Sequence, residues 1–173
     1  MKDGEDMLRF FTPPRRPANE TERQAAVDRL NVVDAARDPR LAAIVARAAA
    51  IFAAPTAMIS IVDGRRQRWI VRHSTDDEGT SRTISFCGHA ILEPQEVLAV
   101  PDALADERFA GNPLVQGEAG IRLYVGAPLV QNDSALGSLC VIDRQPHDVT
   151  AAQTEELRDL AREAVSILER LGR

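Results

Sequence analysis

The chain carries its most informative stretch at Ser85-Phe-Cys-Gly-His-Ala-Ile-Leu92. Three segments follow it in order: Val100-Pro-Asp-Ala103, Gly120-Ile-Arg-Leu-Tyr-Val-Gly-Ala-Pro-Leu129 and Leu136-Gly-Ser-Leu-Cys-Val-Ile-Asp143. The first stretch is compatible with a short helix that ends before Pro94. Residues 121–130 and 136–142 predict two strands around a polar turn at residues 132–134. The segments together indicate a Cys-Gly-His element beside strands that form the wall of a small-molecule pocket.

Composition indicates one soluble domain and excludes several classes of function. The chain has 173 residues and a net charge of -5, so the basic stripe expected of a nucleic-acid-binding protein is missing. No apolar run approaches the length of a membrane span. Two cysteines far apart in the sequence, Cys87 and Cys140, fit neither a disulfide framework nor a zinc spacing. We therefore expect a cytoplasmic protein with no nucleic-acid or membrane partner.

Two helices are predicted near the N-terminus, after a proline-containing lead-in over residues 1–20 that we expect to be flexible. The first follows the capping residues at 19–21 and runs through Asp34, because Ala26, Leu30 and Val33 would share one face. The second opens at Asp38-Pro39, where proline loses no hydrogen bond, and stops before residue 55.

Short strands and one long helix are predicted for the rest of the chain, so that residues 21–173 form a single domain. Residues 57–62 and 68–72 read as a hairpin, 74–81 as a mobile loop, 97–100 as a strand and 105–110 as a helical turn. The pair Thr150 and Gln153 matches a capping box at the start of a C-terminal helix. Helices flanking strands joined by hairpins predict an α/β sandwich, of the α+β type, around a largely antiparallel sheet.

The order of these motifs, with Arg-Phe-Ala-Gly-Asn-Pro-Leu-Val at residues 108–115, resembles the GAF family of sensory domains over about residues 20–171. The resemblance implies a six-stranded antiparallel sheet with helices packed on one face and a ligand pocket on the other. Matched to this chain, the ligand-binding residues would be Phe86, Cys87, His89, Asp102, Phe109, Asn112, Arg122, Tyr124 and Cys140.

The individual site residues also have plainer interpretations. Cys87 and His89 lie two positions apart and would point in different directions on a helix, so the pair alone does not predict a metal site. Cys87 is either a buried core residue beside a positioning histidine, a neighbour of a ligand or haem held by His89, or a nucleophile. Cys140 lies in an apolar run typical of a core. If both cysteines face one pocket, a reversible disulfide becomes an option.

Three other residues divide between ligand binding and structure. Arg122 and Tyr124 would share one strand face, where the arginine would suit an anionic ligand or would simply be exposed. Asp102, after Val100-Pro101, would either contact a ligand or fix a turn by accepting backbone hydrogen bonds.

We predict a non-catalytic sensory or regulatory domain that binds a small molecule. Domains of this family often precede histidine kinases or cyclic-dinucleotide enzymes, and none follows the last predicted helix, so we expect a stand-alone sensor or an effector acting in trans. Apolar stripes on the terminal helices predict a homodimer. The sequence identifies no cofactor.

The alternative function is enzymatic. The chain also resembles the GAF-type free methionine sulfoxide reductases, which use a cluster of cysteines where this chain has Cys87 and Cys140. Bilin-binding relatives place the attachment cysteine directly before a histidine, and here Gly88 separates the two residues.

Overall fold

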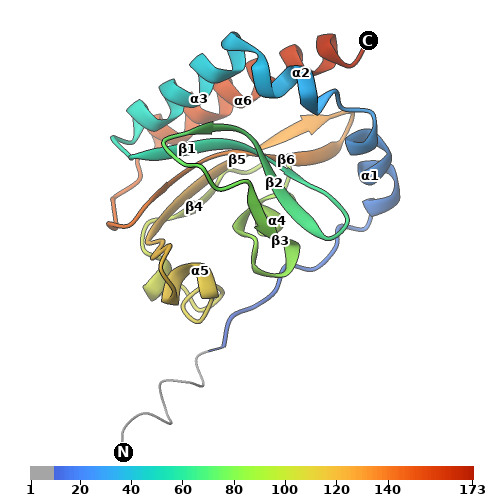
Figure 1. Cartoon of the computed structure of the whole chain (residues 1–173). Coiled ribbons are helices and arrows are strands. Elements are labelled where there is room, and N and C mark those ends of the chain that lie inside the picture. Colours follow the sequence, from blue (N-terminus) through green and yellow to red (C-terminus); the bar gives the residue numbers. More distant parts are fainter. Residues whose placement is uncertain (1–9) are drawn as a thin grey trace, which may run out of the picture.

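A six-stranded antiparallel sheet with helices on one face forms the centre of the protein (Figure 1). The computed structural model describes residues 10–173. The strand order is β3-β2-β1-β6-β5-β4. The three strands that come first in the chain therefore join the three that come last at the β1–β6 pair. The fold is therefore the one that the sequence predicts, with shorter helices and loops on the face opposite the long helices.

The helical layer contains α1 (Glu20–Asp28), α2 (Val32–Arg37), α3 (Pro39–Ile51) and α6 (Ala151–Leu171). The prediction of one helix through Asp34 is wrong. The side chain of Asn31 accepts a hydrogen bond from the backbone N–H of Asp34 and starts a new helix, and Val33 is 60% exposed instead of lying on a buried face. The predicted starts of α3 and α6 are confirmed, the latter with both halves of its capping box.

The strands are β1 (Thr56–Val62), β2 (Arg66–His73), β3 (Gly79–Ser81), β4 (Leu98–Val100), β5 (Leu123–Gln131) and β6 (Ser134–Asp143). The predicted loop at 74–81 ends in the short strand β3, whose backbone pairs with the backbone groups on the free edge of β2. Asn132 and Asp133 both have positive φ, 47° and 67°, as the tight turn between β5 and β6 requires.

Four short helical segments cover the other face: η2 (Arg82–Ile84), α4 (Phe86–Ala90), η3 (Ala103–Ala105) and α5 (Pro113–Gln116). The short helix predicted after Ser85 is confirmed, and the Ser85 hydroxyl accepts from the Gly88 N–H. The helical turn predicted at 105–110 is confirmed, because the N–H groups of Phe109 and Ala110 both donate to the Asp106 carbonyl, at 3.0 and 2.8 Å. The segment η3 precedes this turn and is capped by the Asp102 carboxylate. None of the described helices is both long and apolar enough to cross a membrane.

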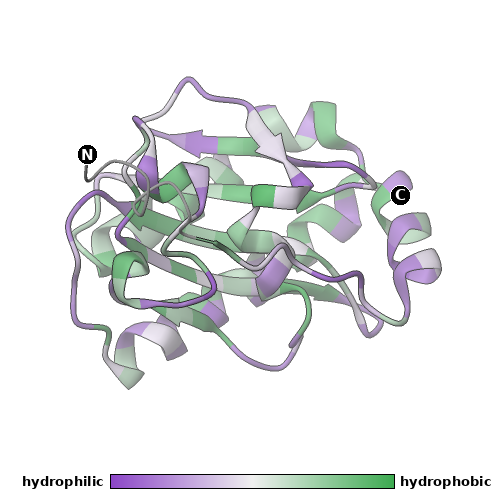
Figure 2. Ribbon diagram, turned by 90° about the horizontal axis from the view of Figure 1, so that it is seen from below, coloured by the Kyte–Doolittle hydropathy of each residue, from purple (hydrophilic) through white to green (hydrophobic). Residues whose placement is uncertain are grey.

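Alternate side chains of the central strands enter two separate cores. Ile59, Val125 and Leu139 pack under the long helices, whereas Met58, Tyr124 and Cys140 face the short helices. Figure 2, seen from the side of the short helices, shows hydrophobic residues along the strands. Two faces of one sheet are therefore both buried, and the second of them holds the cysteines.

The apolar stripe of α6 is buried within the chain. Leu157, Leu160 and Leu168 are almost fully covered in the core between α3, α6 and the sheet. The stripe therefore cannot serve as a free apolar face for a second copy, although it was the feature that predicted a homodimer.

The lead-in contacts the domain where the structure describes it. Its first nine residues lie outside the described part, so their predicted flexibility stays a prediction. The Thr12 N–H donates to the Arg108 carbonyl at 2.9 Å, and the Arg16 guanidinium donates to the Gly64 carbonyl at 2.6 Å. These contacts hold residues 12–16 against the face that carries α4.

A buried ion cluster joins α1 to the sheet and to η2. The guanidinium of Arg23, which is fully buried, donates to the Val62 carbonyl at 2.6 Å and to Glu20 at 2.9 Å. Arg82 donates to both carboxylate oxygens of Glu20, at 2.5 and 3.0 Å. Burial raises the pKa of Glu20, but the hydrogen bonds from Arg82 and Arg23 outweigh it and lower that pKa from 4.5 to about 2.

Replacing Glu20 by glutamine should destabilise the protein by roughly 3 kcal/mol at neutral pH, because two buried arginines lose their counter-charge. The stabilisation by the native carboxylate should be complete above pH 4.5 and disappear as the pH falls towards 2, since the pKa is lower in the folded state. Urea unfolding of Glu20→Gln and of the exposed control Glu22→Gln, at several pH values, tests this. Equal stabilities of the two variants at neutral pH would contradict it.

Candidate functional site

Two cysteines, a tyrosine and a serine meet on the sheet face that carries α4. The Sγ atoms of Cys87 and Cys140 lie 3.8 Å apart. The Ser138 hydroxyl donates to the Cys87 Sγ at 3.0 Å, and the Tyr124 hydroxyl donates to the same sulfur at 3.2 Å. We call Cys87, Cys140, Tyr124 and Ser138 the thiol cluster. All four side chains are buried.

The cluster is assembled from a helix start and two neighbouring strands. Cys87 is the second residue of α4, while Cys140 and Ser138 lie two positions apart on β6 and so share a face. On β5, Gly126 is paired with Cys140. A side chain at Gly126 would collide with the ring and hydroxyl of Tyr124, so this glycine leaves the space through which Tyr124 reaches the sulfur.

Hydrogen bonds favour a thiolate at Cys87. Burial alone raises the pKa of its thiol, but donors at Cys140, Ser138, Ser60 and Tyr124 outweigh burial and lower the pKa from 9.0 to about 6. The Cys140 thiol shifts the other way: its pKa is raised because the hydrogen bond to Cys87, burial and the neighbouring negative charge all favour its protonated form. The pair therefore has one nucleophilic sulfur and one that keeps its proton.

A very small cavity of about 10 Å³ lies beside the two sulfurs. We call it the inner cavity; it has room for about one water molecule. Its lining consists of Met58, Gln67, Trp69, Phe86, Cys87, Leu114, Ile121, Tyr124, Cys140 and Ile142.

A larger hollow of about 540 Å³ lies next to it and opens to solvent; we call it the outer hollow. Trp69, Leu114, Ile121 and Ile142 line both spaces, and we call these four apolar residues the partition. The rest of the hollow is mostly polar or small: Pro55, Thr56, Ser74, Thr75, Asp77, Gly79, Thr80, Ala119, Asp143 and Arg144. Its volume lies within the range of small-molecule sites, roughly 300–1,000 Å³.

The family model described as GAF domain matches residues 36–168 of the chain. The chain belongs to the GAF family. GAF domains are sensory, ligand-binding domains, which supports a sensory role in general terms.

A curated relative named as a cyclic di-GMP phosphodiesterase of Pseudomonas aeruginosa is 46% identical over 136 residues. That match takes in 78% of this chain and only 23% of the relative, so it lies within one part of a much longer protein.

Solved GAF-type structures share the fold at low identity. The GAF domain of an Acinetobacter phosphoenolpyruvate-protein phosphotransferase aligns with a TM-score of 0.62 at 16% identity, covering 88% of this chain and 94% of its own. A free methionine-R-sulfoxide reductase from Neisseria meningitidis, in complex with its substrate, aligns with a TM-score of 0.63 at 15% identity, covering 87% and 86%. Both likenesses concern the fold alone.

Aromatic residues of this GAF domain surround the thiol cluster. Phe86 and Phe109 stack with ring centroids 4.2 Å apart, and Phe86 lies 5.1 Å from Tyr124. His89 contacts the edge of Phe109 and donates from Nε2 to the Thr12 carbonyl at 2.8 Å. Burial lowers the pKa of His89. The structure thus gathers Phe86, Cys87, Phe109, Tyr124 and Cys140 in one core, with His89 at its border.

The other three predicted site residues bond to backbone groups. Asp102 accepts from the Leu104 N–H at 3.1 Å, and Asn112 accepts from the Leu114 N–H at 2.8 Å while donating to the Ile84 carbonyl. Arg122 donates to the carbonyls of Val115 and Ile121 at 2.9 and 3.0 Å. The Arg122 guanidinium thus bonds to the chain itself, and the Tyr124 hydroxyl bonds to Cys87. That these two residues, or any of the nine, bind a ligand stays a prediction.

Sequence reasoning missed the donor Ser138 and the partition residues. Alternation along Gly137-Ser-Leu-Cys140 could have placed Ser138 beside Cys140, because a serine in an apolar strand needs a hydrogen-bond partner. The partition combines distant segments of the chain, so no local pattern indicates it. Within residues 10–173, no three His, Cys, Asp or Glu side chains gather as metal ligands would.

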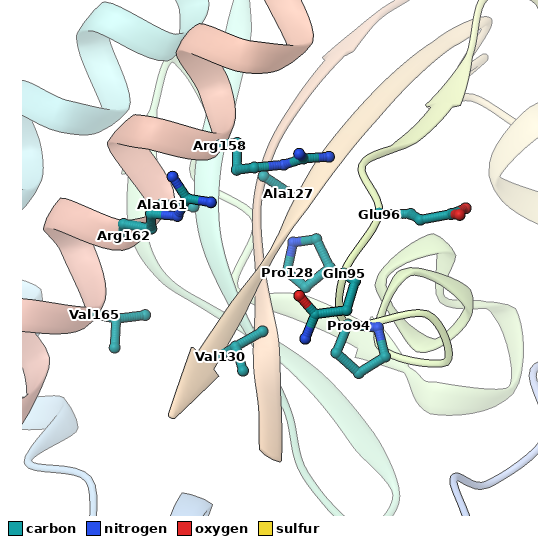
Figure 3. Close-up of a pocket in the computed structure, with 10 residues that line it drawn as sticks. All are labelled: Pro94, Gln95, Glu96, Ala127, Pro128, Val130, Arg158, Ala161, Arg162 and Val165. Carbon is teal, nitrogen blue, oxygen red and sulfur yellow. The ribbon is translucent and has the colours of Figure 1, made fainter. Parts of the chain in front are cut away.

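Another hollow lies between α6 and the loop before β4 (Figure 3). Arg158 and Arg162 of α6 stand on one side of it and Pro94 to Glu96 on the other. Its volume is only about 140 Å³, and both arginines face acids on their own helix, Glu155 at 3.9 Å and Asp159 at 3.4 Å. This surface is therefore a weaker candidate than the outer hollow.

Removing either hydroxyl donor should raise the pKa of Cys87. Ser138→Ala and Tyr124→Phe each delete one hydrogen bond to the sulfur, so the thiolate should form at higher pH than in the native protein. Ultraviolet absorbance of the thiolate against pH measures this, with Cys87→Ala as the baseline. A titration unchanged in both variants would contradict the assigned donors.

Proposed function

We propose that this GAF domain is a non-catalytic sensory unit that binds a small cytoplasmic molecule in the outer hollow. The observation that supports the proposal is the hollow itself: about 540 Å³ on the sheet face that the long helices leave free. The inner cavity, at about 10 Å³, is too small for such a ligand.

The lining suggests the chemistry of the ligand. Trp69 and the aliphatic side chains of the partition offer a flat apolar floor, while Asp77, Asp143 and Arg144 offer charged groups at the sides. Asp143 is already bonded to His147, which leaves Asp77 and Arg144 as the freer charges. A molecule with a planar apolar part and polar substituents fits this combination.

Several of the predicted ligand-binding residues lie behind or beside the floor of the outer hollow. Phe86, Cys87, Tyr124 and Cys140 lie directly behind the partition in the inner cavity. Asn112 holds the start of α5, which carries Leu114 into the partition. Occupation of the hollow would therefore press on the thiol cluster through Leu114 and its neighbours.

The effector that we propose is an enzyme of cyclic-dinucleotide turnover. The 46% identity to one segment of a protein named as a cyclic di-GMP phosphodiesterase supports this choice. The domain would act on such an enzyme either from the same polypeptide or in trans.

Homodimerisation stays a prediction. Because the α6 stripe is covered inside the chain, a dimer through the terminal helices would have to use other residues of this layer, such as the exposed Val33. Light scattering at micromolar concentration tests it.

Mass spectrometry of small molecules released from freshly purified protein, beside its visible spectrum, should identify the ligand. Adding that molecule back should raise the thermal midpoint of the native protein. Ala119→Trp fills the exposed edge of the hollow and should weaken binding at least tenfold, about 1.4 kcal/mol.

The matched control is Ala46→Trp, on the exposed outer side of α3. It should bind like the native protein. If no molecule is released, or if Ala119→Trp binds as well as the control, the proposed ligand site is wrong.

The reductase alternative has one observation in its favour, the nucleophilic character of Cys87. A molecule of the size of methionine sulfoxide does not fit the inner cavity, and the partition covers the sulfur. We therefore expect no turnover of free methionine sulfoxide by the native protein with a dithiol donor. Turnover that Cys87→Ala abolishes would establish the enzyme and contradict the sensory proposal.

A further inference from the structure

We propose that Cys87 and Cys140 are an oxidation site for hydrogen peroxide, which converts the two thiols into a disulfide that joins α4 to β6. The proposal goes beyond ligand binding in the outer hollow and does not rest on it. It depends on the geometry of the thiol cluster, on the chemistry of the two sulfurs and on the path that leads to them.

The two sulfurs are close enough to bond after a small movement. Their separation is 3.8 Å, and a disulfide needs roughly 2.05 Å, so they must approach by roughly 1.7 Å. Cys87 belongs to a five-residue helix between loops, whereas Cys140 lies in the middle of the sheet between β1 and β5. The movement would therefore fall on α4, the less constrained of the two elements.

The two sulfurs have different roles. Cys87 accepts hydrogen bonds from Ser138 and Tyr124, and these donors stabilise its thiolate, which is the nucleophilic form. Cys140 stands behind it as a protonated thiol, because a negative charge on Cys87 raises the pKa of Cys140. Cys87 thus attacks the oxidant and Cys140 resolves the product.

The reaction balances with hydrogen peroxide as the oxidant. The Cys87 thiolate attacks one peroxide oxygen and the O–O bond breaks. The leaving hydroxide takes up one proton, equivalent to the one that the Cys87 thiol released on ionising, and departs as water. Cys87 is then a sulfenic acid. The Cys140 sulfur attacks the Cys87 sulfur, the S–O bond breaks, and the oxygen leaves as a second water with the proton of Cys140. Two thiols lose two electrons and one peroxide gains them.

Access restricts the site to small oxidants. The inner cavity has room for about one water-sized molecule beside the sulfurs. Cys87 and Cys140 are at most 2% exposed, and Trp69, Leu114, Ile121 and Ile142 line the inner cavity as well as the outer hollow. Hydrogen peroxide is close to water in size and polarity, whereas glutathione disulfide and bulky organic hydroperoxides do not fit. The partition therefore predicts selectivity by size.

Oxidation would change the core behind the outer hollow. A disulfide sulfur is a poorer acceptor than a thiolate, so Ser138 and Tyr124 would lose their charged partner and retain their mutual contact at 3.1 Å. The Phe86 ring would move with α4, because Phe86 precedes Cys87 in the chain, and this ring stacks on Phe109. Oxidation of the two cysteines would thereby change the packing against the partition, which lines the outer hollow.

The test treats the native full chain, without denaturant, with hydrogen peroxide and in parallel with cumene hydroperoxide. Hydrogen peroxide should lower the intact mass by two hydrogens and remove both free thiols. After tryptic digestion, the peptides covering residues 83–108 and 123–144 should be joined. Cumene hydroperoxide should react much more slowly, and dithiothreitol should restore both thiols once the oxidised protein is unfolded.

Variants separate the two roles and the size filter. Cys140→Ser should gain one oxygen in mass at Cys87 and give no linked peptides. Dimedone, which is too large for the inner cavity, should trap this sulfenic acid when the oxidised protein is unfolded in its presence. Leu114→Ala removes part of a side chain from the partition and should speed the reaction with cumene hydroperoxide more than that with hydrogen peroxide. The control Ala46→Ser, at an exposed position on α3, should alter neither rate.

The native protein decides the outcome even if a variant fails to fold. The proposal is wrong if both thiols stay reduced in the folded chain, if the disulfide joins two chains instead of residues 87 and 140, or if both peroxides react at equal rates. Because the readout is covalent, these results leave ligand binding in the outer hollow to be judged by its own experiment.

Discussion

Alternate side chains of β1, β5 and β6 must be buried on opposite faces of the same sheet, and the rest of the structure depends on this constraint. Large aliphatic residues such as Ile59, Val125 and Leu139 fill the face under the helices. On the other face, the chain places smaller and polar residues, among them Ser60, Ser138 and Cys140. Buried polar groups there need partners, and they find them in one another and in Cys87.

Close packing explains why this polar core is so well defined. Gly126 leaves room for the Tyr124 ring, and any side chain at Gly137 would collide with the backbone at Ser60. The Tyr124 hydroxyl therefore reaches the Cys87 sulfur because Gly126 has no side chain in its way. Phe86 and Phe109 close the remaining space, so that the thiols lie in a compartment that admits only very small molecules.

The pocket side is consequently divided into two layers with different chemistry. The outer hollow is open and large enough for a metabolite, whereas the inner cavity holds one small molecule beside a nucleophilic sulfur. A single partition separates them. Leu114 and Trp69 line both spaces, so a change in either one would be felt at these two side chains.

Local patterns in the sequence were enough for the order of the elements and for the antiparallel sheet. The Asp38-Pro39 and Thr150–Gln153 signals marked helix starts correctly, because capping depends on residues close together in the chain. The break at Asn31 was missed, since the stripe of Ala26, Leu30 and Val33 continued through it, and a capping contact overrode that periodicity.

The contacts of the candidate site could not be predicted from local patterns. The motifs pointed to four residues that line the inner cavity, but to none that lines the outer hollow. They did not indicate that Arg122 bonds to carbonyls or that Ser138 donates to Cys87. Such contacts join residues far apart in the chain, and their geometry depends on strand register and on side-chain volume. Periodicity and capping are local properties and can be read along the chain. The meeting of two thiols, and the narrow space left beside them, are properties of the packed core, and only the folded chain brings them about.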